Sequence, residues 1–361
     1  MSVRAMLLRA VCACVLGGIL VAGLWPFHTP RNDVSWASDG SGLLFGKHGS
    51  IVSASPLQSH AKQEDNSCAL EIWLQPSRVD KDGMILAFYW PENRVTPFSV
   101  RQYHDGALVL ESKDQGESKK FAVYVGEVFH DAKPVFVTIT SGKSGMAAYV
   151  DGTLVKSDAN FPLSARDLTG QLVIGSAPST AYSWSGLMKG LAIYDRELSA
   201  VEVAQNFHQW TTGGPDSARS GLVARYLFDE GKGSVVRNQI DSATNLLIPD
   251  RFFILNKQFL ERPWEEFRWT LGYWKDAAVN IVGFIPLGFF FYVYFSQLRR
   301  AEHSVAITIA LGFAVSLTIE VTQAFLPTRD SGMTDLITNT LGTAFGVFAF
   351  RHIQARLVDN G

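Results

Sequence analysis

Four segments of the chain are almost entirely apolar and each is about as long as a membrane-spanning helix. They are residues 6–25, 277–297, 304–326 and 336–353. A helix needs about 20 apolar residues to cross the hydrocarbon core of a bilayer. The pattern therefore predicts an α-helical bundle of about four transmembrane helices, built from the two ends of the chain.

A different pattern fills the stretch between the first and second apolar segments. Short runs of strand-forming residues follow one another, separated by turn residues, with no helical periodicity between them. The runs are residues 70–74, 84–89, 98–103, 107–110, 121–125, 135–140, 146–150, 171–174 and 190–194. Strands at this spacing predict an antiparallel β-sandwich. Three of its tryptophans, Trp73, Trp90 and Trp184, are expected to lie mostly in the sandwich core.

Two local signals refine this prediction. Asp151-Gly152 lies between two strand-like runs and predicts a type I′ hairpin turn, because both central residues of that turn need a positive φ. Ser199 and Glu202 form a capping box, which predicts a short helix that ends near Trp210.

Three motifs follow one another in this region: LEIWLQP at 70–76, AAYVDG at 147–152 and WSGLMKGLAIYDRELS at 184–199. They resemble the LamG or concanavalin A-like lectin/glucanase family, which implies a jelly-roll sandwich and a carbohydrate-binding face. No strand carries the paired acids of a glucanase, so glycoside hydrolysis is not expected. The run at 221–233 resembles the opening strand of such domains but comes last, which predicts that the two ends of the domain meet.

Basic residues near the ends of the apolar segments predict the orientation. They are Arg4, Arg9, Arg299, Arg300, Arg351 and Arg356. All six lie on one side of the predicted bundle, and short basic segments are retained in the cytoplasm. We therefore expect a multi-pass protein of the bacterial inner membrane with both termini cytoplasmic and the β-sandwich external. The alternative is that the first segment is a cleaved signal peptide, although no Ala-x-Ala site follows it.

Composition adds little to this picture. The net charge of −2 and the hydrophobic fraction of 47% are averages over one part of the chain that is expected in lipid and another that is expected in water. They give no sign of nucleic-acid binding. Cys68 is the one cysteine of the β-domain, so it cannot form a disulfide there and is expected to be buried. No acidic cluster has metal-ligand spacing. No cofactor is predicted, and Ca²⁺ is a possible ion that no motif supports.

Polar residues recur at same-face spacing in three of the apolar segments. The pairs are Asp276 and Asn280, Glu320 and Gln323, and Asp335 and Asn339. In the predicted topology they lie toward the external ends of their helices. Glu320 is six residues before Leu326, a depth of about 9 Å, which is expensive for a charged group. Arg329, in the loop that follows, is expected to pair with one or more of the acids.

Small residues continue the same helix faces. Gly283 follows Asn280, and Gly342 and Gly346 form a Gly-x-x-x-Gly pair. They are expected to let the helices approach closely. Pro286 is expected to kink the second apolar helix.

This set of polar residues has two alternative interpretations. One is a hydrogen-bonded clamp that fixes helix packing. The other is an outward-facing pocket for a headgroup, a sugar or a phosphate, in which Glu320, Arg329 and Asp335 are the candidate catalytic residues. The candidate substrate-binding residues are then Asp276, Asn280, Gln323 and Asn339.

The same positions carry a second resemblance. The patterns DxxxNxxGFxPLG from 276, ExxQ from 320, RxS from 329 and DxxxNxxG from 335 are similar to the VanZ-like membrane family. So is the segment that ends in Trp-Pro-Phe at 25–27. The resemblance implies a LamG-like domain at 32–262 inserted between a first helix at 1–31 and a VanZ-like domain at 263–361. It supplies no reaction, although the family takes its name from glycopeptide antibiotic resistance.

The leading hypothesis is a cell-envelope protein whose sandwich binds a glycan or glycoconjugate next to membrane lipids. One alternative is a membrane enzyme that acts on lipid-linked or lipid-headgroup substrates. Another is a non-catalytic partner in exopolysaccharide or cell-wall assembly. The sequence identifies neither the glycan nor the oligomeric state.

Overall fold

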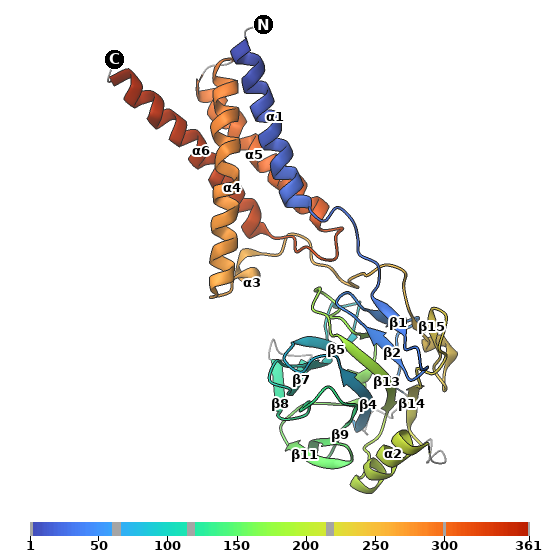
Figure 1. Cartoon of the computed structure of the whole chain (residues 1–361). Coiled ribbons are helices and arrows are strands. Elements are labelled where there is room, and N and C mark those ends of the chain that lie inside the picture. The colour runs from blue at the N-terminus through green and yellow to red at the C-terminus, as the bar shows by residue number, and fades with distance from the viewer. Residues whose placement is uncertain (1–2, 60–65, 114–119, 214–219, 299–300, 360–361) are drawn as a thin grey trace. The chain divides into compact units, whose positions relative to one another are not determined.

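The chain folds into two compact units in this computed structural model, which describes residues 3–59, 66–113, 120–213, 220–298 and 301–359 (Figure 1). Residues 1–29 and 257–361 form the first unit, here called the membrane unit. Residues 30–256 form the second, here called the sandwich unit. The membrane unit is therefore assembled from the two ends of the chain.

The sandwich unit consists of two antiparallel sheets, which confirms the predicted β-sandwich. The first runs β1-β2-β13-β4-β9-β10-β11, with β14 beside β13. Its strands are β1 (Val34–Trp36), β2 (Leu43–Phe45), β4 (Cys68–Pro76), β9 (Val135–Gly142), β10 (Gly145–Val150), β11 (Thr153–Asp158), β13 (Gly186–Tyr194) and β14 (Leu222–Tyr226). The second runs β15-β16-β3-β12-β5-β6-β7-β8. Its strands are β3 (Ile51–Ser53), β5 (Gly83–Tyr89), β6 (Phe98–Gln102), β7 (Leu108–Lys113), β8 (Lys120–Val125), β12 (Gln171–Ile174), β15 (Val235–Val236) and β16 (Leu246–Leu247).

Side-chain alternation along the strands separates the core from the outer faces. On β4, Leu70, Ile72 and Leu74 belong to the core between the sheets, so Glu71 and Trp73 lie on the opposite, outer face. Trp184 is buried in the core as predicted, and its Nε1 donates to Gln102 Oε1 at 2.8 Å. The core prediction is wrong for Trp73, which is only half-buried.

The predicted turn and helix are both present. Asp151 and Gly152 have φ angles of 48° and 77° and join β10 to β11, as the hairpin signal requires. The helix is α2 (Ala200–Thr212), which begins at the capping box of Ser199 and Glu202 and ends at Gly213. Trp210 therefore occupies its last turn.

The two ends of the sandwich unit lie side by side, as expected. Asn32 N donates to Asp250 O at 3.1 Å, and Phe252 N donates to Pro30 O at 3.1 Å. These bonds form a short antiparallel pairing in which Arg31 faces Arg251. The chain thus enters and leaves the sandwich unit at one place, which suits a domain inserted between two helices.

The membrane unit contains α1 (Val3–Leu24), the short α3 (Pro263–Glu266), α4 (Leu271–Ser296), α5 (Ala301–Gln323) and α6 (Met333–Asp359). Within the described part of the chain, three helices are long and apolar enough to cross a membrane, namely α1, α4 and residues 303–323 of α5. The protein is therefore membrane-associated. The fourth expected span lies in α6, whose first turns carry Asp335, Thr338 and Asn339; these polar residues lower its hydropathy, so its crossing stays a prediction.

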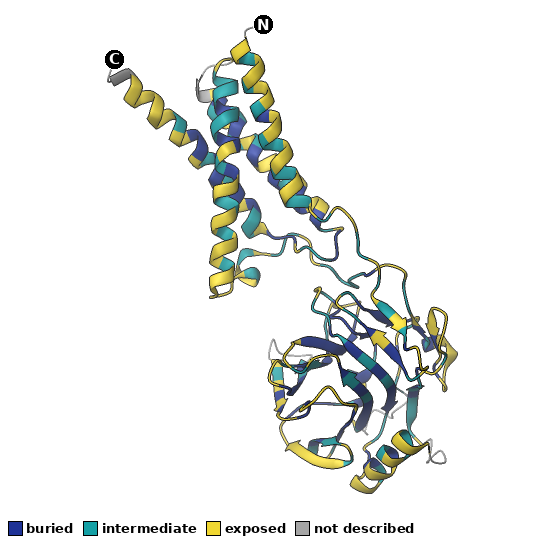
Figure 2. Cartoon of the chain, in the orientation of Figure 1, coloured by how far each residue is buried: buried dark blue, intermediate teal, exposed yellow. Residues whose placement is uncertain are grey.

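Large apolar side chains remain exposed on these helices (Figure 2). Examples are Val279, Val282, Phe345 and Phe348, each at least half exposed. In contrast, α1 packs into the bundle, because Val15 and Ile19 contact the cluster that contains Phe284 and Ile319. Exposed apolar faces around a packed interior are what a lipid environment favours.

Glycines bring the backbones of α4 and α6 close together. A Cβ added at Gly342 would lie 2.1 Å from Ile281 O, and one at Gly346 would lie 2.1 Å from Ile285 O. The predicted role of these two glycines is therefore supported. Gly283 was expected to act with them, but no atom lies within 4 Å of its Cβ position, so that expectation is wrong. Pro286 lies inside α4, which continues as a helix on both sides.

We predict that Gly346→Ala destabilises the membrane unit by about 1–3 kcal/mol, because the added methyl group meets a backbone carbonyl that cannot move alone. Gly283→Ala is the matched control on the facing helix. It adds the same methyl group to open space and also improves helix propensity. Thermal unfolding of both variants in detergent, followed by tryptophan fluorescence, provides the measurement. Equal unfolding midpoints would contradict the close packing.

Candidate functional site

Glu320, which was predicted, and Glu266, which was not, accept hydrogen bonds at the beginning of α6. Glu320 is 1% exposed, and its carboxylate accepts a hydrogen bond from Gly332 N at 2.9 Å. Glu266, from α3, accepts from Thr334 N at 3.0 Å. The first N–H groups of a helix have no partner within the helix, and its N-terminus favours negative charge. Two carboxylates from distant segments therefore fix the start of α6.

Two amides join α6 to its neighbours. Asn280, on α4, donates through Nδ2 to Asp335 Oδ1 at 2.7 Å. Asn339 donates through Nδ2 to Ser316 Oγ, on α5, at 3.0 Å. Asp276, one turn before Asn280, is exposed. Same-face spacing thus identified Asn280 and Asn339 as residues that bond across the bundle, while their partners come from the fold.

Gln323 and Arg329 bind the end of α1. Gln323 Nε2 donates to Gly23 O at 2.7 Å. Arg329 Nε donates to Trp25 O at 2.9 Å, and its Nη2 bonds to the same oxygen. The expectation that Arg329 pairs with the acids is wrong, because among the described residues neither Glu320 nor Asp335 has an ion-pair partner. The carbonyls at the end of α1 need donors, and the guanidinium supplies them.

Lys257 was not predicted from the sequence. Its Nζ donates to Gln323 O at 2.6 Å and to Leu326 O, which caps the C-terminus of α5. Burial lowers the pKa of Lys257 to about 8, although the negative charges of Asp330 and Glu320 oppose this shift. No periodicity or motif surrounds this lysine in the sequence, so only the fold reveals its role.

The contacts of these side chains support the clamp interpretation. Glu320, Gln323, Arg329 and Lys257 each bond to backbone atoms at a helix end. The structure brings Asn280 and Asp335 together, but it does not place Arg329 beside them. The catalytic assignment of Glu320, Arg329 and Asp335 stays a prediction.

We predict that Glu320→Ala lowers the stability of the membrane unit by about 1–3 kcal/mol, because it leaves Gly332 N–H buried without its acceptor. Glu320→Gln keeps an oxygen that can accept this bond, so its loss is smaller. Thr318→Ala, at an exposed position of the same helix, is the control. Detergent melting curves of the three variants rank them, and a Gln variant as unstable as the Ala variant would refute the capping role.

A second candidate site lies on the outer face of the first sheet of the sandwich unit, beside α2. It is a cavity of about 440 Å³, here called the α2 pocket. Its lining includes Trp73, Lys189, Gln209, Trp210, Arg225 and Asp229. Its size lies within the range of about 300–1,000 Å³ that is typical of small-molecule sites.

Strand geometry places these side chains on the same face. Trp73 alternates with the core residues of β4 and pairs in register with Gly190 of β13. The pairing shifts between Met188 and Gly190, which makes Lys189 the extra residue of a β-bulge, a feature that re-aims side chains. Arg225, on β14, pairs with Ala192 and reaches the pocket from the other side.

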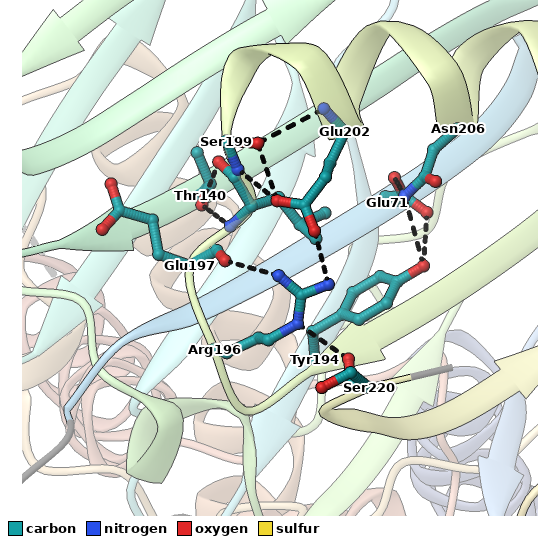
Figure 3. Close-up of polar contacts among 10 residues, drawn as sticks. Glu71, Thr140, Tyr194, Arg196, Glu197, Ser199, Glu202, Asn206 and Ser220 are labelled. Carbon is teal, nitrogen blue, oxygen red and sulfur yellow. Dashed lines mark hydrogen bonds and ion pairs between the residues drawn. The ribbon is translucent and has the colours of Figure 1, made fainter. Parts of the chain in front are cut away.

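Glu71 holds α2 against the sheet. Its buried carboxylate accepts hydrogen bonds from Asn206 Nδ2 at 2.7 Å and Tyr194 Oη at 3.0 Å (Figure 3). Trp210 Nε1 donates to the same carboxylate at 3.1 Å. Burial raises the pKa of Glu71, and these three hydrogen bonds and the charge of Arg225 oppose the shift. The polar anchor fixes one wall of the α2 pocket.

The ring of Trp210 needs a glycine beneath it. A Cβ at Gly190 would lie 2.4 Å from the ring, so a larger residue there would displace the indole. Cations lie over both indoles of the pocket. Lys189 Nζ is 4.9 Å from the Trp73 ring centroid, and Arg225 Cζ is 4.9 Å from that of Trp210, within the range of cation–π attraction.

The sequence suggested this pocket only in part. Alternation along β4 could have placed Trp73 outside the core, because its neighbours Ile72 and Leu74 face inward. The bulge at Lys189 and the distant Arg225 have no such signal. Among the described residues, no group of three or more His, Cys, Asp or Glu side chains is arranged to hold a metal ion.

Comparison with known families confirms both resemblances. Residues 47–204 match the model of the concanavalin A-like lectin/glucanases superfamily. Residues 222–354 match the VanZ/LLP1 model, a match that begins at β14 and continues into α6. The chain therefore combines a concanavalin A-like lectin/glucanase domain with a VanZ-like region. No curated protein sequence matches it.

Solved structures similar to the chain are remote. A putative carbohydrate binding protein from Bacteroides ovatus is 12% identical, with 63% of each chain covered and a TM-score of 0.38. The binding domain of Paraclostridial Mosquitocidal Protein 1 is also 12% identical, with 51% of this chain and 47% of that chain covered and a TM-score of 0.35. The Ruminococcus gnavus IT-sialidase CBM40 is 12% identical, with 39% and 83% covered and a TM-score of 0.34. The chain spans less than two thirds of the first two.

Proposed function

We propose that this protein is a membrane-anchored glycan-binding protein of the bacterial cell envelope. Its sandwich unit binds a glycan or glycoconjugate in the α2 pocket, and its membrane unit anchors that binding site. The observation that carries the proposal is the pocket itself, in which two indoles and several polar side chains converge. Few convergent polar groups among aromatic walls are typical of sites for small ligands.

Two further observations support this function. The match to a superfamily of lectins and glucanases covers β4 and β13, which supply Trp73 and Lys189. The polar anchor around Glu71 holds Trp210 in place before any ligand arrives, and a preformed wall reduces the entropy cost of binding. The clamp in the membrane unit then has a structural task, namely to keep the anchoring helices together.

We predict that Trp73→Ala weakens binding of full-length protein to bacterial polysaccharides at least tenfold, because it removes one wall of the pocket. Tyr124→Ala is the control, since Tyr124 is an exposed aromatic residue on β8 of the other sheet. A glycan array probed with detergent-solubilised protein identifies the polysaccharide and ranks the variants. Loss of binding in the Tyr124 variant alone would move the site to the second sheet.

We further propose that the protein lies in the inner membrane with both termini in the cytoplasm and the sandwich unit outside. The distribution of basic residues around the apolar helices supports this orientation, and a glycan-binding domain needs access to the envelope. A C-terminal fusion to green fluorescent protein should be fluorescent, whereas a C-terminal fusion to alkaline phosphatase should be inactive. An active phosphatase fusion would reverse the orientation of α6.

A further inference from the structure

We infer that the α2 pocket binds an acidic glycan, whose carboxylate or phosphate lies between Lys189 and Arg225. This inference rests on the proposed glycan-binding function and adds the class of ligand. It depends on how the two cations lie relative to the two indoles of the pocket.

The indoles do not offer bare faces for a neutral sugar. A neutral sugar packs its C–H groups against an open aromatic face. Here Lys189 Nζ lies over Trp73, and the Arg225 guanidinium lies over Trp210, each at 4.9 Å from the ring centroid. All four side chains line the same cavity. The surface that meets a ligand is therefore cationic as well as aromatic.

The cations are held in position. Lys189 Nζ donates one hydrogen bond to Ser41 O at 3.1 Å, and an ammonium group has three donors. Arg225 lies on β14, which pairs with β13 at Ala192, and its guanidinium lies over the Trp210 ring. A guanidinium binds carboxylate or phosphate oxygens through paired N–H groups, whereas an ammonium acts as a point charge. Together they form a site with two different donors for one anion.

Among the described residues, the lining of the pocket holds more cations than acids. Asp229 is the one acid among the lining residues that the structure describes, and it is exposed. Glu71 lies behind Trp210, where its buried carboxylate accepts three hydrogen bonds and interacts with Arg225. Asp39 acts on Lys189 from the surface, where water screens the interaction. The described lining residues therefore include two cations, Lys189 and Arg225, and one acid.

The test compares acidic polysaccharides with neutral forms of the same polymers. Full-length protein in detergent is applied to an array on which each uronate-containing polymer is printed beside its carboxyl-reduced form. Each phosphate-containing polymer is printed beside its dephosphorylated form. We expect at least tenfold weaker binding after the charge is removed, and the pair that shows this loss distinguishes a carboxylate from a phosphate ligand.

Variants then assign the effect to the pocket. Lys189→Gln and Arg225→Gln should lose most of the preference for the charged polymer, whereas Lys156→Gln, at an exposed position on β11 of the same sheet, should keep it. Circular dichroism checks that each variant is folded. If Arg225→Gln does not fold, Lys189→Gln alone decides the outcome.

Each outcome has a separate meaning. Equal binding of charged and neutral forms by the wild-type protein overturns this inference and leaves the proposed function intact. A charge preference that survives in Lys189→Gln and Arg225→Gln also overturns it, because the anion then binds elsewhere. Binding to no printed polymer overturns the proposed function together with the inference.

Discussion

Backbone groups at helix ends are the constraint on which the membrane unit depends. The first N–H groups and the last carbonyls of a helix have no partners within the helix, and lipid offers none. In this protein, side chains from distant segments provide them. Glu320 and Glu266 accept hydrogen bonds from backbone N–H groups at the start of α6. Lys257 donates to a carbonyl at the end of α5, and Arg329 donates to a carbonyl just after α1. Each of these charged side chains, which is costly near a membrane, thereby bonds to a backbone group that has no partner within its helix.

In the sandwich unit, the buried carboxylate of Glu71 attaches α2 to the first sheet. Glu71 lies in the middle of β4, where alternation directs it out of the core and under α2. Its carboxylate gathers donors from β13 and from two turns of α2. The helix is therefore attached by oriented hydrogen bonds as well as by apolar contact through Val203 and Leu198. This directional attachment positions Trp210 at the rim of the pocket.

Local patterns predicted the elements well, because strands, hairpins and capping boxes depend on neighbouring residues. The turn at Asp151-Gly152 and the helix after Ser199 are examples. Spacing also identified the polar faces that contain Asn280 and Asn339. Partners across the fold could not be predicted in this way. Arg329 was expected to pair with a carboxylate, but its guanidinium bonds to the carbonyl oxygen of Trp25, which follows the end of α1.

The α2 pocket illustrates the same limit. Trp73 was assigned to the core from its residue type, although its place in the alternation of β4 indicates the outer face. Lys189 reaches the pocket through a β-bulge, whose position depends on the pairing of two strands far apart in the sequence. Arg225 lies on β14, which follows α2 in the chain and pairs with β13. Such convergence is a property of the assembled sheet.

The adjoining ends of the sandwich unit have a mechanical consequence. The chain enters and leaves through backbone pairing around Arg31 and Arg251. A pull on this domain is therefore divided between two covalent tethers, each continuous with a helix of the membrane unit. A domain attached at only one end would put the whole load on a single strand. Insertion thus gives the domain a doubled attachment to the membrane unit.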